Sequence, residues 1–323
     1  MSMSNLIFCK TPLQSLIVNR ILETSEENSK TYILYIPNNK SQLHKIYFDK
    51  IQAKSKFFLE YNEFYFSDTL SHLIRFYKLP KFFREHTFKK IYFASLGDLV
   101  LSLLLGRNSG CKLHLFDDGT FNREKDHFLH FITIVSLMKR SIMFFLRGEK
   151  PLDTYKKLSC YHTILPRSFS HWIDCRIDYI NLFDKLNKKR LTKISSSQNL
   201  RVFIGGFFDQ PFKVALKPQY IQILQTFKAD IHIPHPGNKT EKFYIRNDLR
   251  PLFLNHSFAN MIAEEVIITL LNSGYKVHLY GFHSTVLFNM SKYTPTISIA
   301  LNADQYLKKN KFNKAGIKLI RGY

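Results

Sequence analysis

The chain has 323 residues, of which 47 are Lys or Arg and 25 are Asp or Glu, and its formal net charge is +22. Because 45% of the residues are hydrophobic, the chain can form folded cores, and global disorder is excluded. The basic excess implies an anionic partner, such as a nucleic acid, an anionic lipid or a phosphorylated substrate. The basic residues are dispersed along the chain and no zinc-finger or helix-turn-helix pattern accompanies them, so we expect no nucleic-acid partner.

Short apolar runs alternate with helical spacing, which predicts an α/β fold with parallel sheets. In the first half we expect strands at 5–8, 31–37, 90–94 and 112–116, and helices at 12–23 and ending near 105. In the second half we expect strands at 200–204, 229–233 and 276–280, helices at 219–228 and 257–272, and a basic helix with a tail from 303. A polar connector at 185–198 places the domain boundary, so the expected domains are 1–190 and 191–323.

Four expected strands end in polar or special residues: 9–14 (CKTPLQ), 117–120 (DDGT), 235–237 (HPG) and 281–285 (GFHST). In parallel sheets, ligands bind beyond the carboxyl ends of the strands. These four segments are therefore the candidates for a substrate site between the two halves.

The acidic pair is the candidate for a general base. Asp117 and Asp118 are adjacent, so in extended backbone they point to opposite faces, and only one can reach a substrate. A carboxylate in a partly dry site can take a proton from a sugar hydroxyl, while the other carboxylate orders the turn. The alternative is that the whole DDGT segment is only a turn or a helix cap.

Two further segments suit an anionic ligand. His235 precedes Pro236, which restricts the local backbone and suits a histidine presented to a phosphate as donor or acid. Ser284 and Thr285 follow Gly281 and can open a helix, where hydroxyls and free backbone N–H groups bind anions. The alternatives are a turn histidine without chemistry and a simple helix cap.

Neither a metal nor a cofactor is expected. The four cysteines form no CxxC pair, the spacing of His232 and His235 matches no zinc pattern, and the chain contains no Asp-x-Asp sequence. The phosphate-binding GxxxxGK[ST] and GxGxxG motifs are also absent, which argues against ATPase and dinucleotide-dependent functions.

A cytoplasmic location is expected, with peripheral attachment to the inner face of the membrane. The first residues lack the basic region of a secretory signal, and the longest apolar stretch, 127–146, is interrupted by Lys139 and Arg140. The candidate membrane contact is 127–147, where aromatic and aliphatic residues are interleaved with basic ones, although a core helix fits this pattern nearly as well.

The strand-end motifs resemble a known family. Segments 116–120 (FDDGT) and 234–236 (PHP) resemble the acidic-acidic-Gly and His-Pro motifs of bacterial sialyltransferases. Segments 6–14 (LIFCKTPLQ) and 280–285 (YGFHST) resemble glycosyltransferase family 52, the lipooligosaccharide sialyltransferases, and all four motifs occur in that family's order.

The resemblance implies a GT-B type fold, in which two Rossmann-like domains have parallel sheets facing a central cleft. It implies an acceptor-side domain at 1–190 and a domain at 191–323 that binds CMP-N-acetylneuraminic acid. The implied reaction is inverting, metal-independent transfer to a terminal galactose of lipooligosaccharide, with an α-2,3 linkage. The partners expected are this donor, this acceptor, an anionic membrane surface and a second copy of the chain.

By the same resemblance, Asp117 is the base and His235 is the acid or phosphate partner. Ser284 and Thr285 are phosphate contacts, and Glu264 or Glu265 binds the cytidine ribose. The remaining expected donor contacts are Thr11, Gln14, Asp118, Gly119, Pro236 and Gly281. The chain differs from the HPRE-like pattern of many members, because 237–239 is GNK.

Two other functions fit the sequence. One is a family 52-like glycosyltransferase that uses another nucleotide sugar, and the other is a non-catalytic basic protein that binds nucleic acid or membrane. Protection from heat unfolding by free CMP would distinguish the sialyltransferase from both.

Overall fold

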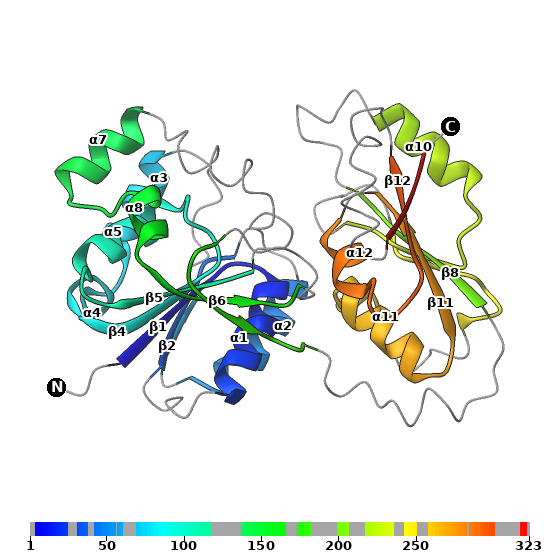
Figure 1. Cartoon of the computed structure of the whole chain (residues 1–323), viewed down its shortest axis with the longest axis horizontal. Coiled ribbons are helices and arrows are strands. Elements are labelled where there is room, and N and C mark those ends of the chain that lie inside the picture. The colour runs from blue at the N-terminus through cyan, green and yellow to red at the C-terminus, as the bar shows by residue number, and fades with distance from the viewer. Residues whose placement is uncertain are drawn as a thin grey trace. The chain divides into compact units, whose positions relative to one another are not determined.

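The computed structural model of this chain (Figure 1) describes residues 4–24, 31–37, 42–55, 57–60, 69–117, 137–165, 173–182, 199–206, 217–235, 242–250, 258–282, 284–300 and 317–321. It divides into two compact units, the first comprising Met1–Ile164 with His171–Leu182 and the second Leu165–Ser170 with Phe183–Tyr323. The expected boundary at 190/191 lies in 183–198, outside the described residues. Each unit is described by itself below.

The first unit is built on a parallel sheet, here called sheet A. Among the described residues it has seven strands in the order β3-β2-β1-β4-β5-β6-β7. The strands are β1 (Ser4–Cys9), β2 (Thr31–Tyr35), β3 (Phe57–Glu60), β4 (Phe88–Phe93), β5 (Lys112–Phe116), β6 (Leu158–Thr163) and β7 (Arg176–Tyr179). The helices are α1 (Pro12–Thr24), α2 (Gln42–Gln52), α3 (Thr69–Lys78), α4 (Lys81–Glu85), α5 (Leu99–Arg107), α7 (Leu137–Phe145) and α8 (Pro151–Lys156).

Helices cover both faces of sheet A, which explains why its central strand is apolar throughout. All six residues of β1 are buried. Successive side chains of the strand point to opposite faces, so Phe8 packs with α5 in one core and Ile7 packs with α1 in the other. Figure 1 shows α1 and α2 on one side of the sheet and α4, α5 and α7 on the other.

The second unit is built on sheet B, whose order within the described residues is β10-β9-β8-β11-β12-β13. Its strands are β8 (Asn199–Ile204), β9 (Ile231–Ile233), β10 (Tyr244–Ile245), β11 (Lys276–Gly281), β12 (Thr296–Ala300) and β13 (Ile317–Arg321). Its helices are α10 (Lys217–Thr226), the 3-10 turn η5 (Phe258–Asn260), α11 (Ala263–Asn272) and α12 (Thr285–Met290). The β9–β10 pair is antiparallel and the other pairs are parallel.

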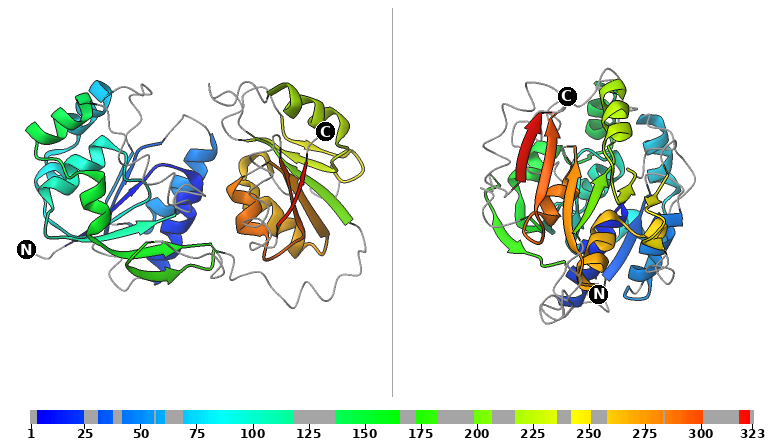
Figure 2. Two further views of the ribbon diagram at one scale, coloured as in Figure 1. Left: turned by 45° about the horizontal axis from the view of Figure 1, so that its top comes forward. Right: turned by 90° about the vertical axis from the view of Figure 1, so that its right-hand side faces the viewer.

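Sheet B is also covered on both faces. Val202 and Ile204 of β8 pack in one core with residues of α11 and α12, while Phe203 packs in another with Tyr220 of α10. The views in Figure 2 show the orange helices α11 and α12 on one face of sheet B and the yellow-green helix α10 on the other. The α/β prediction is therefore confirmed for each unit.

Two expected helices were wrong in part. The helix at 257–272 is divided into η5 and α11, because Ile262 between them has extended backbone (φ −69°, ψ 157°). The basic helix from 303 is contradicted over Ile317–Arg321, which forms β13 beside β12; residues 301–316 lie outside the described residues. Ile317 and Leu319 are buried while Lys318 between them is exposed. The sequence here therefore has the apolar–polar alternation of a strand, although its many basic residues suggested a basic helix.

No helix in the described part of the chain is both long and apolar enough to cross a membrane. Lys139 and Arg140, which interrupt the apolar stretch 127–146, lie in α7. The residues of this stretch before 137 are outside the described residues.

Gly281 gives a testable constraint on sheet B. A Cβ atom at this position would lie 2.8 Å from the backbone oxygen of Ile204 in the neighbouring strand. We expect Gly281→Ala to lower the free energy of unfolding by about 1–3 kcal/mol, since β8 and β11 must move apart. The measurement is urea unfolding followed by circular dichroism. The control is Gly110→Ala, whose Cβ meets nothing within 4 Å, and equal stability of the two variants would contradict the close packing.

Candidate active site

The carboxyl edge of sheet A brings three charged residues to neighbouring strands. Lys10 follows β1, Asp98 follows β4 and Asp117 follows β5, and these strands are adjacent in the order β1-β4-β5. The chain passes from β1 to β2 on one side and reaches β4 on the other, so the strand order reverses between β1 and β4. Ligands of open parallel sheets bind at such reversal points.

Lys10 and Asp98 form an ion pair at this reversal point. The Lys10 ammonium nitrogen lies 2.5 Å from Oδ2 of Asp98, whose side chain is only 2% exposed. The other oxygen, Oδ1, accepts hydrogen bonds from the backbone N–H groups of Val100 (2.8 Å) and Leu101 (3.2 Å) and so caps α5. The Asp98 carboxylate thus holds the Lys10 ammonium beside the end of β1 and at the same time caps the start of α5.

Thr11 and Gln14, which the sequence assigned to donor binding, build the start of α1. The Gln14 N–H donates to Oγ1 of Thr11 at 3.2 Å, and Oε1 of Gln14 accepts from the Lys10 N–H at 2.7 Å. Pro12 occupies the first helical position, where its missing N–H costs nothing. These contacts form a reciprocal cap like the capping box, and they fix the loop after β1.

Asp117 is completely buried, with 0% of its surface exposed. Its Oδ1 accepts a hydrogen bond from the Tyr161 hydroxyl, while Oδ2 accepts from Oγ1 of Thr163 at 2.8 Å and from the Ile164 N–H at 2.6 Å. All three donors belong to β6 or to the residue after it. Asp117 therefore ties the end of β5 to the end of β6.

The Tyr161 hydroxyl stays protonated in this arrangement. Burial, together with the neighbouring Asp117 carboxylate, raises the pKa of Tyr161 well above its ordinary value. The phenol therefore remains protonated at neutral pH and donates to Asp117. Asp118 and Gly119 lie outside the described residues.

The residues of β6 were missed at the level of sequence, because no strand was expected between 112–116 and 200–204. The strand LSCYHT alternates, with Tyr161 and Thr163 on the face of Asp117 and Cys160 and His162 on the opposite face. The signal was weak because polar side chains occur on both faces of the strand.

The carboxyl edge of sheet B brings the second group of expected residues together. His235 follows β9, Gly205 and Gly206 follow β8, and Gly281 ends β11, and these strands are adjacent in the order β9-β8-β11. The Gly205 N–H donates to the backbone oxygen of Ile233 at 2.8 Å, which keeps the exits of β8 and β9 in contact. His235 is half-buried at this edge, whereas its neighbour Pro236 lies outside the described residues.

The expected helix after Gly281 is confirmed. Ser284 is the N-cap of α12, with its hydroxyl oxygen accepting from the Leu287 N–H at 3.5 Å, and Thr285 is the first helical residue. Both residues are partly exposed. The capping function expected as the alternative is therefore present, and it leaves the Thr285 hydroxyl and the first N–H groups of the helix near the end of β11.

Glu264 is buried between two helices. Its Oε1 accepts a hydrogen bond from Nδ2 of Asn289 at 2.9 Å, which connects the first turn of α11 to α12. Burial raises the pKa of Glu264. The neighbouring Glu265 is only partly buried.

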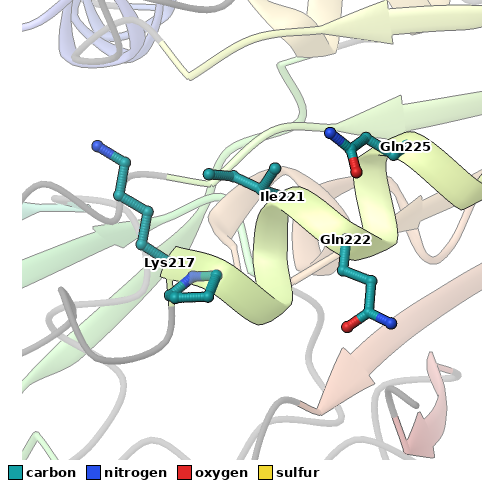
Figure 3. A pocket seen from close by; sticks show the side chains of 5 residues that line it. Lys217, Ile221, Gln222 and Gln225 are labelled. Atoms are coloured by element: carbon teal, nitrogen blue, oxygen red, sulfur yellow. The ribbon is translucent and has the colours of Figure 1, made fainter.

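A shallow surface pocket lies along the exposed side of α10 (Figure 3). It is lined by Lys217, Pro218, Ile221, Gln222 and Gln225. None of these is an expected site residue, and no carboxylate or histidine lines it, so we assign it no role in the chemistry.

Comparison with known proteins identifies related chains. The model of glycosyltransferase family 52 matches residues 28–302. A CMP-N-acetylneuraminate:beta-galactoside alpha-2,3-sialyltransferase of Pasteurella multocida is 24% identical over 314 residues, covering 93% of this chain and 92% of that protein. An N-acetyllactosaminide alpha-2,3-sialyltransferase of Haemophilus influenzae is 24% identical over 311 residues, covering 91% of this chain and 90% of that protein.

The fold has a counterpart among solved structures. The crystal structure of TcCGT1 in complex with UDP is similar with a TM-score of 0.54 and 10% identity, covering 99% of this chain and 86% of that chain. At this identity the likeness shows the fold alone, which is the two-domain α/β architecture of GT-B type.

The contacts of Asp117 predict a role in stability. We expect Asp117→Asn to lower the free energy of unfolding by about 1–3 kcal/mol, because the amide NH₂ group would face a donor at one of its former acceptor positions. Tyr161→Phe, which removes a single donor, should cost less. Heat and urea unfolding measure both effects. Asp49→Asn, at an exposed carboxylate of α2, is the control, and an Asp117→Asn protein as stable as this control would contradict the assignment.

Proposed function

Because the chain belongs to glycosyltransferase family 52, we propose that it transfers N-acetylneuraminic acid from CMP-N-acetylneuraminic acid to a terminal galactose of lipooligosaccharide. The chain is a glycosyltransferase with a two-domain fold of GT-B type. The observation that carries the finer proposal is that relatives aligned over more than nine-tenths of the chain are alpha-2,3-sialyltransferases by name.

The proposed reaction is an inverting displacement. A carboxylate takes the proton of the galactose hydroxyl, whose oxygen forms a bond to the anomeric carbon of the sialic acid. The bond from this carbon to the phosphate oxygen breaks, and CMP leaves as a phosphate monoester whose new charge needs a proton or a hydrogen-bond donor. The chain must therefore present one base and at least one phosphate partner.

The acidic pair supplies the base in this proposal, and the contacts of Asp117 favour a division of tasks. Only one of two adjacent carboxylates in extended backbone can face the substrate, and Asp117 is buried with both oxygens engaged by donors of β6. These contacts support the turn-ordering role for Asp117. We therefore move the proposed base from Asp117 to Asp118.

The edge of sheet B supplies the donor contacts in this proposal. His235 gives the proton or hydrogen bond to the departing phosphate, and Ser284 and Thr285 provide further phosphate contacts from the start of α12. Glu264 supports this group by holding α12 against α11 through Asn289, so the partly exposed Glu265 is the better candidate for the ribose. Gly119, Pro236 and Gly281 remain proposed donor contacts, and Thr11 and Gln14 shape the loop after β1.

A direct assay tests this proposal. The chain is incubated with a β-galactoside acceptor and with CMP-N-acetylneuraminic acid, and in parallel with UDP-galactose and UDP-N-acetylglucosamine. We expect transfer from the CMP donor. Transfer from a UDP sugar alone would leave the family assignment intact but show that the proposed CMP donor is wrong. The departure from the HPRE-like pattern at 237–239 (GNK) would then be the first place to look for the changed donor preference.

The same assay assigns the base. We expect Asp118→Asn to lower the rate by about 100- to 10,000-fold while the unfolding temperature and the affinity for CMP stay near those of the wild type. His235→Gln should also lose rate at unchanged stability. Asp117→Asn, corrected for its folded fraction, should lose less. If the folded fraction of Asp117→Asn is inactive and Asp118→Asn is active, then Asp117 is the base, as the family resemblance alone implies.

Transfer is expected to continue in excess EDTA. The sequence has no Asp-x-Asp segment to hold a divalent ion on a diphosphate, and a monophosphate leaving group requires less countercharge. Initial rates are compared with and without chelator well below the unfolding temperature. A rate that disappears in EDTA and returns with Mg²⁺ or Mn²⁺ would exclude this mechanism.

We also propose that α7 contacts an anionic membrane surface, where a lipid-linked acceptor is found. Its last residues, Phe144 and Phe145, are 76% and 78% exposed, while Met143 beside them is buried in the core of the first unit. Arg140 and Arg147 are exposed on the same segment. This combination of anchored helix, exposed aromatic rings and nearby cations favours an interfacial contact.

Vesicle sedimentation tests the membrane contact. We expect binding to phosphatidylglycerol vesicles at low salt, with loss as the screening length falls from about 10 Å at 0.1 M to about 3 Å at 1 M. Serine at both Phe144 and Phe145 should weaken binding, whereas Ile221→Ser, at an exposed apolar residue of the second unit, should not. A wild-type chain that stays in the supernatant at low salt would refute the contact.

A further inference from the structure

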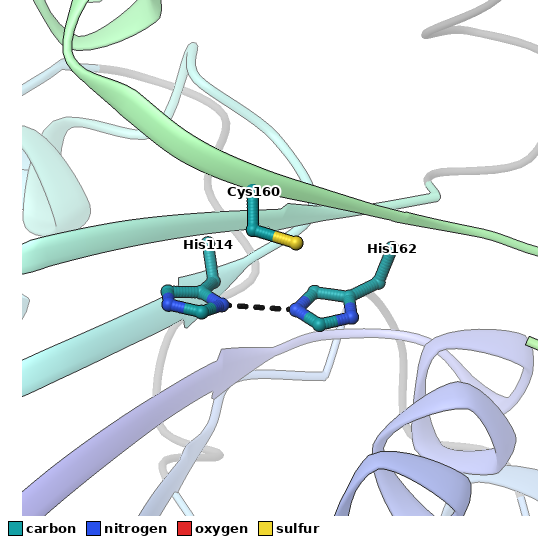
Figure 4. A group of neighbouring side chains, drawn as sticks. All are labelled: His114, Cys160 and His162. Atoms are coloured by element: carbon teal, nitrogen blue, oxygen red, sulfur yellow. Dashed lines mark hydrogen bonds between the residues drawn. The ribbon is translucent and has the colours of Figure 1, made fainter. Parts of the chain in front are cut away.

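A cluster of metal-ligating side chains lies on the face of β5 and β6 opposite to the Asp117 contacts. His114 is in β5, and Cys160 and His162 are in β6, two residues apart and therefore on one face of the strand. The strand register pairs His114 with Cys160, and it pairs His162 with Asp178 of β7. Figure 4 shows the two imidazole rings and the thiol grouped together.

The donor atoms of this cluster converge. Nδ1 of His114 lies 2.9 Å from Nε2 of His162, and one ligand atom from each of His114, Cys160 and His162 lies within 4.8 Å of the others. Tetrahedral zinc, with Zn–N bonds of about 2.0–2.1 Å and Zn–S bonds of about 2.3 Å, places its ligand atoms about 3.3–3.6 Å apart. Shifts of a few tenths of an ångström to about one ångström would therefore fit the three ligand atoms around one ion.

The chemistry of the cluster is that of a zinc site. Nδ1 of His114 and Nε2 of His162 face each other in a hydrogen bond, which a zinc ion replaces when both nitrogens bind it through their lone pairs. Tyr92 packs against both rings, with centroids 4.5 Å and 5.7 Å away, and restricts their orientation. Two imidazoles and a thiolate form a set that zinc prefers over magnesium or calcium.

Asp178 is placed to support these ligands. Its Oδ2 accepts a hydrogen bond from the Cys160 thiol at 3.2 Å and lies 3.7 Å from Nδ1 of His162. A carboxylate behind the second nitrogen of a histidine favours the tautomer whose other nitrogen, here Nε2, is free to bind metal. Arg176 contacts the remaining oxygen of Asp178 at 2.9 Å and fixes the carboxylate.

We propose that His114, Cys160 and His162 bind one zinc ion, with Asp178 as the carboxylate that orients His162. On binding, the Cys160 thiol releases its proton to solvent and the thiolate sulfur bonds to zinc, while a water molecule occupies the fourth position. The ion joins β5 to β6 on the face opposite to Asp117, and its role is structural. This inference does not depend on the sugar donor or on the catalytic assignments proposed above.

Cobalt binding tests the site without reference to activity. Untagged protein, stripped of metal and kept reduced, is titrated with Co²⁺ and then with Zn²⁺. We expect one equivalent of Co²⁺ to give the visible bands of a four-coordinate site and a thiolate-to-cobalt charge-transfer band in the near ultraviolet. Zinc should abolish both bands and raise the unfolding temperature. The absence of bands at one equivalent in the wild type would overturn the proposal.

Variants identify the ligands. Cys160→Ser should lose the charge-transfer band, and His114→Gln should lose stoichiometric binding. Asp178→Asn should keep the spectrum with an affinity about 10- to 100-fold lower. Cys111→Ser changes a partly buried cysteine of the same unit that lies outside the cluster, and it should behave like the wild type. A charge-transfer band that persists in Cys160→Ser and vanishes in Cys111→Ser would overturn the assignment, and circular dichroism verifies the folding of each variant.

Discussion

The hydrogen bonds of the buried Asp117 carboxylate hold together the carboxyl edge of sheet A, between β5 and β6. Its three donors all come from β6 and the residue after it, so the end of β5 is fixed by two side chains and one backbone N–H more than forty positions away. Because β6 alternates, the same strand that holds Asp117 with Tyr161 and Thr163 turns Cys160 and His162 to its other face. One strand thus determines both the position of Asp117 and the grouping of the histidines.

The second unit prepares its edge by backbone contact and capping. Gly281 permits β11 to lie against β8, the Gly205 N–H joins the exits of β8 and β9, and Ser284 begins α12 directly after the sheet. The Glu264–Asn289 hydrogen bond then holds α12 against α11. In our proposal the phosphate meets groups whose positions are already fixed, which reduces the reorganisation that the departure of CMP would otherwise require.

Much of the fold was predictable from local pattern, and the candidate site only in part. The apolar runs of β1 and β5 and the helix of Ser284 and Thr285 were recognisable because each signal lies within a few residues. The ion pair of Lys10 with Asp98 joins residues 88 positions apart, and His114 and His162 are 48 apart. Sequence spacing does not reveal such pairs, because the order of the strands in the sheet decides them. Near Ile317 the basic composition concealed a strand, β13, which pairs with β12 in sheet B.

The central claim is that the chain is built to bind a CMP-linked sugar. The most direct test is heat unfolding of the wild-type protein with CMP, with UDP and with neither nucleotide. We predict that CMP at about 100 times its dissociation constant stabilises the folded protein by about 2.7 kcal/mol and raises the unfolding temperature, while UDP at the same concentration has little effect. Stabilisation by UDP and not by CMP would contradict the claim and assign this family 52 chain to another nucleotide sugar.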